Sequence, residues 1–313
     1  MEEYLQDFTI PTDIILMKLN PLKNPAIRRS IYSILDRYNP RKSNSIASLS
    51  DDYITKELLS SGWYEMPFLL LLEKLLKKSM IDSKFENCAI DIGANIGNHS
   101  LFLSGIFDKV LAVEPNPICV NLMKATKDAN LVSNILIIPK GVGDVIENKD
   151  LMFNEAHTGG GTFLNSELDS NARRFNVEID TVDNIVSQYT GNNSNIRFIK
   201  IDAEGFETNV INGAKQTLKL HSPLLAFEAH GKDNYDEVSN ALAKEGYKSF
   251  YRLIQSRRMY KSFMLNALNM LLRPNIIKIE KINCSQDTNY QMVLASKDKD
   301  CKHLDQMNGL FIG

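Results

Sequence analysis

The sequence has few cysteines, no surplus of positive charge and no long apolar run, and each shortage excludes a class of protein. Its four cysteines lie far apart and form no Cys-x-x-Cys pair, which argues against a zinc knuckle or a disulfide framework and favours a reducing compartment. The formal net charge is −2, so we expect no nucleic-acid partner. The longest apolar run, "MPFLLLL", is far short of a transmembrane segment, and the acidic start "MEEYLQDFTI" lacks the layout of a signal peptide. The sequence therefore predicts a cytoplasmic protein.

Much of the chain alternates short apolar runs with stretches of helical spacing. The runs are "CAIDIG", "KVLAVEP", "NILIIPKGV", "IRFIKIDAEG" and "PLLAFEAH", and helices are expected around 98–107, 117–130, 207–220 and 235–246. This alternation predicts an α/β fold with a mostly parallel sheet and helices on both faces. Two later runs, "IIKIEKI" and "YQMVLAS", predict an antiparallel pair of strands at one edge of the sheet.

The composition divides the chain into three parts. Residues 1–80 form an N-terminal arm with a helical extension that includes "MPFLLLLEKLLKKS", residues 81–300 form the main domain, and residues 301–313 form a tail. A stretch at about 145–185, with the Gly-rich "EAHTGGGTF", interrupts the alternation. We expect it to be an insertion over the carboxyl edge of the sheet, where open α/β folds bind ligands.

The turn "AIDIGANIGNHS" after the first apolar run is the clearest ligand-binding motif. A triphosphate loop requires GxxxxGK[ST], but Asn98 and His99 occupy the positions of its second glycine and its lysine. A dinucleotide loop requires GxGxxG, but Asn95 and Asn98 replace its second and third glycines. The turn therefore fits neither ligand well.

The pattern that remains, Asp91-x-Gly93-x-Asn95-x-Gly97, resembles motif I of the class I methyltransferases that use S-adenosylmethionine (SAM). The ammonium of SAM would be received by Asp91 or by backbone carbonyls, and its carboxylate would lie at backbone N–H groups near the start of the following helix. A second acid should follow the next strand and bind the ribose diol, and "VLAVEP" places Glu114 there.

Further segments resemble the FkbM-type methyltransferases in order and spacing. They are "GWYEMP", "AIDIGANIGNHSLFLS", "VLAVEPNP", "GVGD", "IDTVDNI", "FIKIDAEGFETNVINGAKQTL" and "PLLAFE", and they cover roughly residues 50–250. The resemblance implies a class I Rossmann-like fold with a seven-stranded, mostly parallel sheet, an antiparallel edge strand and an N-terminal helical extension. It also implies SAM as cofactor and methyl transfer to hydroxyl groups of sugars, polyketides and related secondary metabolites.

Ten residues are predicted to bind the cofactor. Asp144 lies where such folds hold the adenine, although an aspartate in a loop is also a common turn former, and Glu65 is included on family position alone. His99 shares a helical face with apolar residues, so we interpret it as packed beside the cofactor rather than catalytic. The full set is Glu65, Asp91, Gly93, Asn95, Gly97, Asn98, Glu114, Pro115, Asp144 and Asp202.

Acids and histidines after the fourth and fifth apolar runs are the candidates for catalysis. Asp202 and Glu204 in "KIDAEGFE" lie two residues apart, as do Glu228 and His230, and His157 lies in the Gly-rich insertion. The candidates for the base are His157, His230, Asp202 and Glu204, and acceptor contacts are expected from His157, Glu204, Glu228 and His230. An isolated Asp-x-Glu pair is weak evidence for a metal, so none is predicted.

We interpret the chain as a SAM-dependent O-methyltransferase that acts on a sugar, a glycan component or a secondary metabolite. Two alternatives remain open at this stage, an NAD-dependent oxidoreductase and a SAM-fold interaction module without catalysis. The basic and apolar stretch 252–272 could contact a membrane surface, pack on the sheet or join a second subunit in a homo-oligomer.

Overall fold

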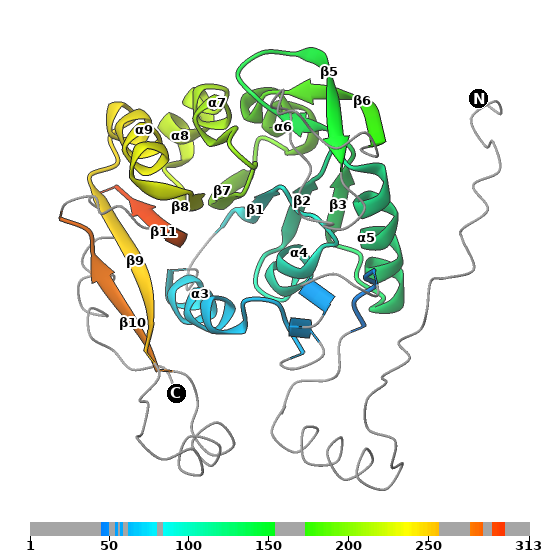
Figure 1. Ribbon diagram of the computed structural model, residues 1–313, viewed down its shortest axis with the longest axis horizontal. Coiled ribbons are helices and arrows are strands. Elements are labelled where there is room, and N and C mark those ends of the chain that lie inside the picture. Colours follow the sequence, from blue (N-terminus) through cyan, green and yellow to red (C-terminus); the bar gives the residue numbers. More distant parts are fainter. Residues whose placement is uncertain are drawn as a thin grey trace, which may run out of the picture.

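The computed structural model describes residues 45–49, 54–55, 57–58, 62–79, 84–153, 173–256, 276–283 and 290–297. Eight strands form its main sheet, in the order β10-β9-β11-β8-β7-β1-β2-β3 (Figure 1). These strands are β1 (Glu86–Ile92), β2 (Lys109–Val113), β3 (Ile135–Ile138), β7 (Ser194–Ile201), β8 (Leu224–Ala229), β9 (Ser249–Ser256), β10 (Ile276–Lys281) and β11 (Tyr290–Ser296). Strands β3, β2, β1, β7 and β8 run parallel to one another.

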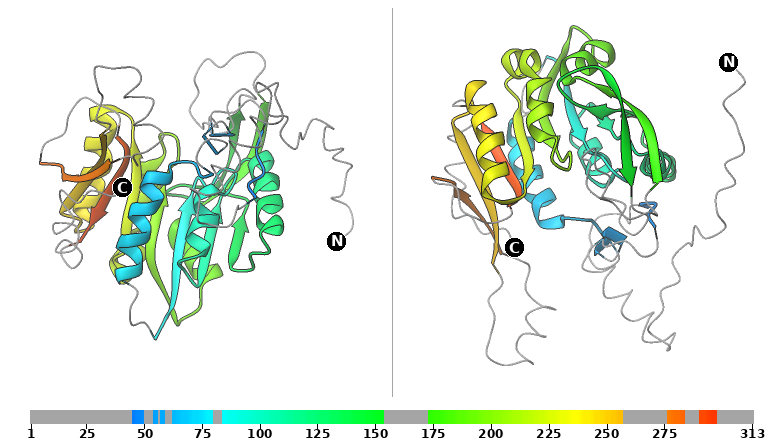
Figure 2. Two further views of the ribbon diagram at one scale, coloured as in Figure 1. Left: turned by 90° about the horizontal axis from the view of Figure 1, so that it is seen from below. Right: turned by 45° about the horizontal axis from the view of Figure 1, so that its top comes forward.

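Helices cover both faces of the main sheet, as the alternation of the sequence predicted (Figures 1 and 2). One face carries α3 (Met66–Ser79), α4 (Asn98–Ser104) and α5 (Pro117–Ala129), and the other carries α6 (Val182–Tyr189), α7 (Glu207–Asn212), α8 (Lys215–His221) and α9 (Gly231–Lys244). Successive side chains of β1 alternate between the two cores: Ala89 packs with the leucines of α3, and Ile90 packs with α7 and α8. Because both faces of β1 are buried, residues 88–92 are apolar with the exception of Asp91.

The far edge of the main sheet differs from the prediction in strand number and in pairing. The sheet has eight strands rather than seven, and β10 and β11 do not pair with each other. Strand β11 lies between β8 and β9 and is antiparallel to both, whereas β10 pairs antiparallel with β9 at the edge. Burial explains this order, since Met292–Ala295 of β11 are all buried and need neighbours on both sides. In β10, buried Ile279 is followed by the partly exposed Glu280, which suits an edge strand.

Two strands within the predicted insertion join the short β4 before it in a second, three-stranded sheet, in the order β4-β6-β5. Strand β5 (Glu147–Phe153) pairs antiparallel with β6 (Arg173–Asp180), and the short β4 (Gly141–Val142) pairs parallel with β6. The right view of Figure 2 shows this hairpin apart from the main sheet. The part of the insertion that contains His157 lies outside the described residues.

The strand order reverses direction between β1 and β7. From β1 the chain continues outward through β2 and β3, and it then returns to the other side of β1 with β7 and β8. In open α/β sheets, the carboxyl ends of the strands on the two sides of such a reversal diverge and leave a crevice that binds ligands. The topology therefore places the expected binding site at the ends of β1, β2, β7 and β8.

Candidate active site

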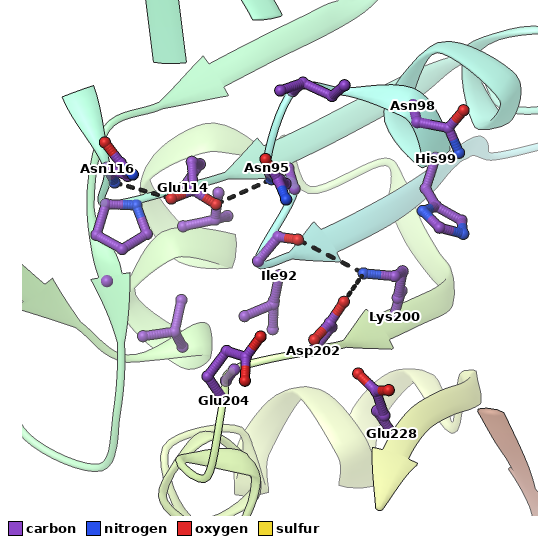
Figure 3. A pocket seen from close by; sticks show the side chains of 18 of the residues that line it. Ile92, Asn95, Asn98, His99, Glu114, Asn116, Lys200, Asp202, Glu204 and Glu228 are labelled. Carbon is purple, nitrogen blue, oxygen red and sulfur yellow. Dashed lines mark hydrogen bonds and ion pairs between the residues drawn. The ribbon is translucent and has the colours of Figure 1, made fainter. Parts of the chain in front are cut away.

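A cavity lies at this reversal of strand order, and Figure 3 shows it from close by. Its wall is formed by the turn after β1, by Glu114 after β2, by Asp202 and Glu204 after β7, and by Glu228 near the end of β8. Four segments that are far apart in the sequence thus contribute side chains to one site. The parallel strands cause this convergence, because they bring their carboxyl ends to the same edge of the sheet.

The turn after β1 packs against the backbone that follows β7. Gly93 has a φ of +69°, and its N–H donates to the carbonyl of Val113. A Cβ atom on Gly93 would lie 1.7 Å from the carbonyl oxygen of Asp202, so only glycine fits here. Gly97 also has a positive φ, but its α-carbon faces Met123 and it does not line the cavity. The two glycines therefore shape the turn through backbone conformation and close packing.

Glu114 is buried at the cavity wall and is held by two backbone groups. Its Oε2 accepts from the N–H of Asn95 at 2.9 Å, and its Oε1 accepts from the N–H of Asn116 at 2.8 Å. Burial raises the pKa of this carboxyl to about 7, against the lowering effect of the two N–H donors. Each carboxylate oxygen has a second lone pair, so Glu114 can still accept two hydroxyl groups from a diol.

Lys200 is the main residue of the site that sequence reasoning missed. Its side chain is only 2% exposed, and its ammonium lies 3.1 Å from Asp202 Oδ2 and 3.6 Å from Asp91 Oδ1. Asp91 is fully buried and does not line the cavity, and its second oxygen accepts from Ser100 Oγ at 2.6 Å. Asp91, which with backbone carbonyls was a predicted acceptor for the cofactor's ammonium, therefore points to Lys200 in this structure.

The acids after β7 and β8 have different electrostatic environments. Burial disfavours ionisation of Asp202, but the adjacent ammonium of Lys200 overcomes this and lowers the pKa of Asp202. Burial, followed by the charge of Asp202, raises the pKa of Glu204 to about 7 and that of Glu228 to about 9. His230 also lines the cavity, and its half-exposed ring lies 4.0 Å from Glu228. The ends of β7 and β8 thus combine one acid with a lowered pKa and two acids with raised pKa values.

The opposite wall is formed by the start of α4 and the segment before α3. His99 lines the cavity, and its Nε2 lies 3.1 Å from Glu65, which does not itself line it. The side chain of Asn98 donates to the carbonyl of Tyr64 and accepts from the N–H of the same residue, so it fixes this segment to α4. The ring of His99 lies 6.1 Å from that of Phe68, and its proximity to Glu65 was not predicted from the sequence.

Two further predicted positions are placed by the structure, and one is not. Pro115 lines the cavity. Asp144 does not, and its carboxylate accepts from Asn209 Nδ2 at 3.0 Å. Lys140, two residues before "VGD", lines the cavity without having been predicted and forms ion pairs with Glu178 and Asp180 of the second sheet. His157 lies outside the described residues, so its role as a base stays a prediction.

The residues of this cavity fit SAM. Glu114 offers two acceptor oxygens for the ribose diol, and the acids at the ends of β7 and β8 suit a cofactor with a net positive charge. The side-chain amide of Asn116 borders the cavity, and its buried Nδ2 has no hydrogen-bond partner among the described residues, so a donor remains available beside Glu114. The turn has no lysine for a phosphate, and SAM needs none.

A mostly parallel sheet of this order, with a glycine turn after β1 and an acid after β2, is the fold of the class I SAM-dependent methyltransferases. The chain belongs to the FkbM family of methyltransferases, because the model of the methyltransferase FkbM domain matches residues 91–249, just over half of the chain. The resemblance in the sequence is thereby confirmed, and SAM is the cofactor of the family fold. An NAD-dependent oxidoreductase finds no support in this assignment.

Solved structures with similar folds include three from bacteria. Methyltransferase FkbM from Methylobacillus flagellatus KT is 21% identical, with 57% of this chain and 42% of that one covered and a TM-score of 0.40. Precorrin-6y C5,15-methyltransferase from Geobacter metallireducens GS-15 is 12% identical (75% and 92% covered, TM-score 0.41). SMU.1697c from Streptococcus mutans, in complex with S-adenosylhomocysteine, is 14% identical (75% and 99% covered, TM-score 0.39). The chain thus spans less than half of the first protein, and no curated protein matches it.

Proposed function

We propose that the chain transfers the methyl group of SAM to a hydroxyl oxygen of a small-molecule acceptor, with a sugar, a glycan component or a polyhydroxylated secondary metabolite as the best fit. The observation that supports this most strongly is the convergence of Asp202, Glu204 and Glu228 on the cavity from the ends of two adjacent strands. Carboxylates accept hydrogen bonds from hydroxyl groups, and several of them in one site suit an acceptor that carries several hydroxyls.

The same acids favour oxygen over nitrogen as the methyl acceptor. An amine that entered a site with ionised Asp202 would be held in its ammonium form, because a nearby negative charge favours the protonated state. An ammonium has no lone pair with which to attack a methyl group. An alcohol remains neutral in this environment and needs only a base to take its proton.

Glu204 is the base in this proposal. Its side chain lines the cavity, and its pKa of about 7 matches a general base that works near neutral pH. The Glu204 carboxylate would take the acceptor's proton while the methyl group passes to the acceptor oxygen, with its bond to the cofactor sulfur broken and S-adenosylhomocysteine as the leaving group. Glu228, with a pKa of about 9, is protonated at neutral pH and can donate a hydrogen bond to a neighbouring oxygen of the acceptor. His230 is half-exposed at the rim, where it can contact the acceptor, and His157 remains a candidate outside the described residues.

The cofactor supplies an electrophilic methyl group, so much of the protein's task is alignment. Glu114 would hold the ribose, and the backbone around Gly93 and Asn95 would fix the depth of the cofactor in the cavity. Asp202 would remain ionised beside Lys200 and stabilise positive charge in the bound cofactor.

The test is methyl transfer from isotopically labelled SAM to a panel of acceptors. The panel contains neutral saccharides, polyhydroxylated polyketides, primary amines and an RNA oligonucleotide, and each labelled product is analysed for its linkage. We expect label in alkali-stable ethers of the polyhydroxylated compounds. Label on nitrogen or on RNA would contradict the proposal, as would an absence of labelled product from every hydroxyl compound when SAM binds.

A further inference from the structure

The ammonium of Lys200 lies between the end of β1 and Asp202 (Figure 3). It donates to Asp202 Oδ2 at 3.1 Å and to the carbonyl of Gly93 at 3.5 Å, and it forms an ion pair with Asp91 Oδ1 at 3.6 Å. The turns after β1 and β7 are also joined by a backbone hydrogen bond from Asp202 N to the carbonyl of Ile92 at 3.1 Å. Lys200 is therefore shared between the cofactor turn after β1 and the acid-bearing turn after β7.

We propose that Lys200 is a positioning residue, which ties the cofactor turn to the end of β7 and sets the charge that the acids of the cavity share. A lysine is almost never fully buried unless it is paired, and this one is paired on both sides. A methionine of similar length could fill the same space, so packing alone does not require an ammonium at this position. The ammonium matters because it lies between two carboxylates, one of them fully buried, and without it both would lack their cation.

Acids from several elements surround Lys200, and its charge therefore acts on a group of carboxylates. Asp91 faces it from β1, Asp202 and Glu204 from the turn after β7, Glu114 from the end of β2, Glu228 from β8, Glu65 from the segment before α3, and His99 of α4 faces Asp202. Such coupled groups titrate as a set. Loss of the ammonium is expected to raise the pKa values of these acids, so that they stay protonated to higher pH.

The experiment measures the affinity of SAM against pH by calorimetry, from pH 5.5 to 9.5, for the full chain and its variants. SAM carries a net positive charge, so its affinity rises as the acids ionise. Lys200→Met should shift the midpoint of this curve to higher pH by about one pH unit. This is the lower end of the shift expected when an opposite charge is removed from within ~4 Å. The amine of SAM titrates identically in every measurement, so a difference between variants reports the protein.

Lys200→Met leaves the buried Asp91 and the partly exposed Asp202 without their cation and could fail to fold, so a second variant is needed. The double variant Asp91→Asn with Lys200→Met removes the buried carboxylate together with the ammonium. It should shift the midpoint of the affinity curve to higher pH by less than Lys200→Met alone does. Lys109→Met is the matched control, because Lys109 lies at the opposite end of β2 and bonds to the carbonyl of Tyr189. A merely structural role would weaken binding at every pH without moving the curve, and an unmoved curve in either folded variant overturns the inference.

This measurement tests the role of Lys200 separately from the proposed function. Only the expected effect of Lys200 on catalysis rests on the proposed function. Because calorimetry uses SAM alone, Lys200 is tested whether or not an acceptor is known. A displaced curve in a chain that methylates no hydroxyl compound would uphold the role of Lys200 and reject the proposed reaction. When an acceptor is found, the acid limb of kcat/KM against pH should move in the same direction as the binding curve.

Discussion

A side chain on Gly93 would collide with the carbonyl oxygen of Asp202, because a Cβ atom would lie 1.7 Å from it. Gly93→Ala must therefore separate the turns after β1 and β7 or distort both. Its φ of +69° adds further strain for alanine. We expect a loss of about 3 kcal/mol or more of unfolding free energy, from overpacking and the left-handed backbone together, and a large loss of SAM affinity. Urea unfolding and calorimetry measure the two effects.

Gly191→Ala is the control for this substitution. Gly191 is exposed, a Cβ atom there would meet nothing nearer than 4.0 Å, and its φ lies outside the left-handed region. It should change the unfolding free energy by well under 1 kcal/mol. If Gly93→Ala proved equally harmless, the close approach of the two turns would not exist in the protein.

Glu114 provides a prediction about the cofactor. In Glu114→Gln, the side-chain amide must turn an NH₂ group toward the backbone N–H of either Asn95 or Asn116, and one acceptor for the ribose is lost. We expect SAM to bind about 10- to 100-fold more weakly, which corresponds to about 1.4–2.8 kcal/mol. Glu237→Gln, at an exposed position of α9, is the matched control. Wild-type affinity in Glu114→Gln would mean that the ribose lies elsewhere.

Three acids of the cavity make the stability of the cofactor-free protein depend on pH. The pKa values of Glu114 and Glu204 are raised to about 7 and that of Glu228 to about 9, so the folded state retains protons that the unfolded chain releases near pH 4.5. Folded-state stability is therefore lost as pH rises from about 4.5 through 7 and on to 9. Asp202, whose pKa is lowered, has the opposite sign, and its contribution disappears only in acid.

We accordingly expect Tm to fall between pH 6 and 9, and Glu228→Gln to reduce this fall. At pH 9 the variant should melt at least about 2 °C above the wild type, the shift that ~1 kcal/mol produces in a domain of this size. Thermal unfolding followed by circular dichroism measures both, with Glu237→Gln as the exposed control. Identical slopes for Glu228→Gln and the wild type would show that Glu228 is not held in its protonated form.

Sequence patterns located the cavity because the determinants are local. A glycine turn follows one apolar run, acids follow three others, and the parallel sheet implied by the alternation brings these ends together. Glu114, Asp202, Glu204, Glu228 and His230 accordingly all line one cavity. The parallel part of the sheet and the convergence of these side chains needed no information about distant contacts.

The parts that sequence reasoning missed depend on tertiary contacts. Lys200 lies within an apolar run, two residues before Asp202 and so on the same side of the strand, and that position was its only signal. The direction of Asp91 away from the cavity follows from its partners Lys200 and Ser100, which belong to other elements. The placement of β11 inside the sheet likewise depends on the burial of its neighbours, which an apolar run alone does not reveal.

Glu204→Gln separates catalysis from cofactor binding. Glutamine keeps the volume and the polarity of the side chain but cannot take the proton of a hydroxyl group. Because Glu204 makes no hydrogen bond with Glu114 or with the cofactor turn among the described contacts, SAM affinity should change by only about threefold, while kcat falls by about 10²-fold, the lower end of what a general base contributes. The wild-type kcat should rise with pH through about 7 as this carboxyl ionises, and the variant should lose that dependence. A variant with wild-type kcat and an unchanged pH profile would exclude Glu204 as the base and leave His230, Asp202 and His157 as candidates.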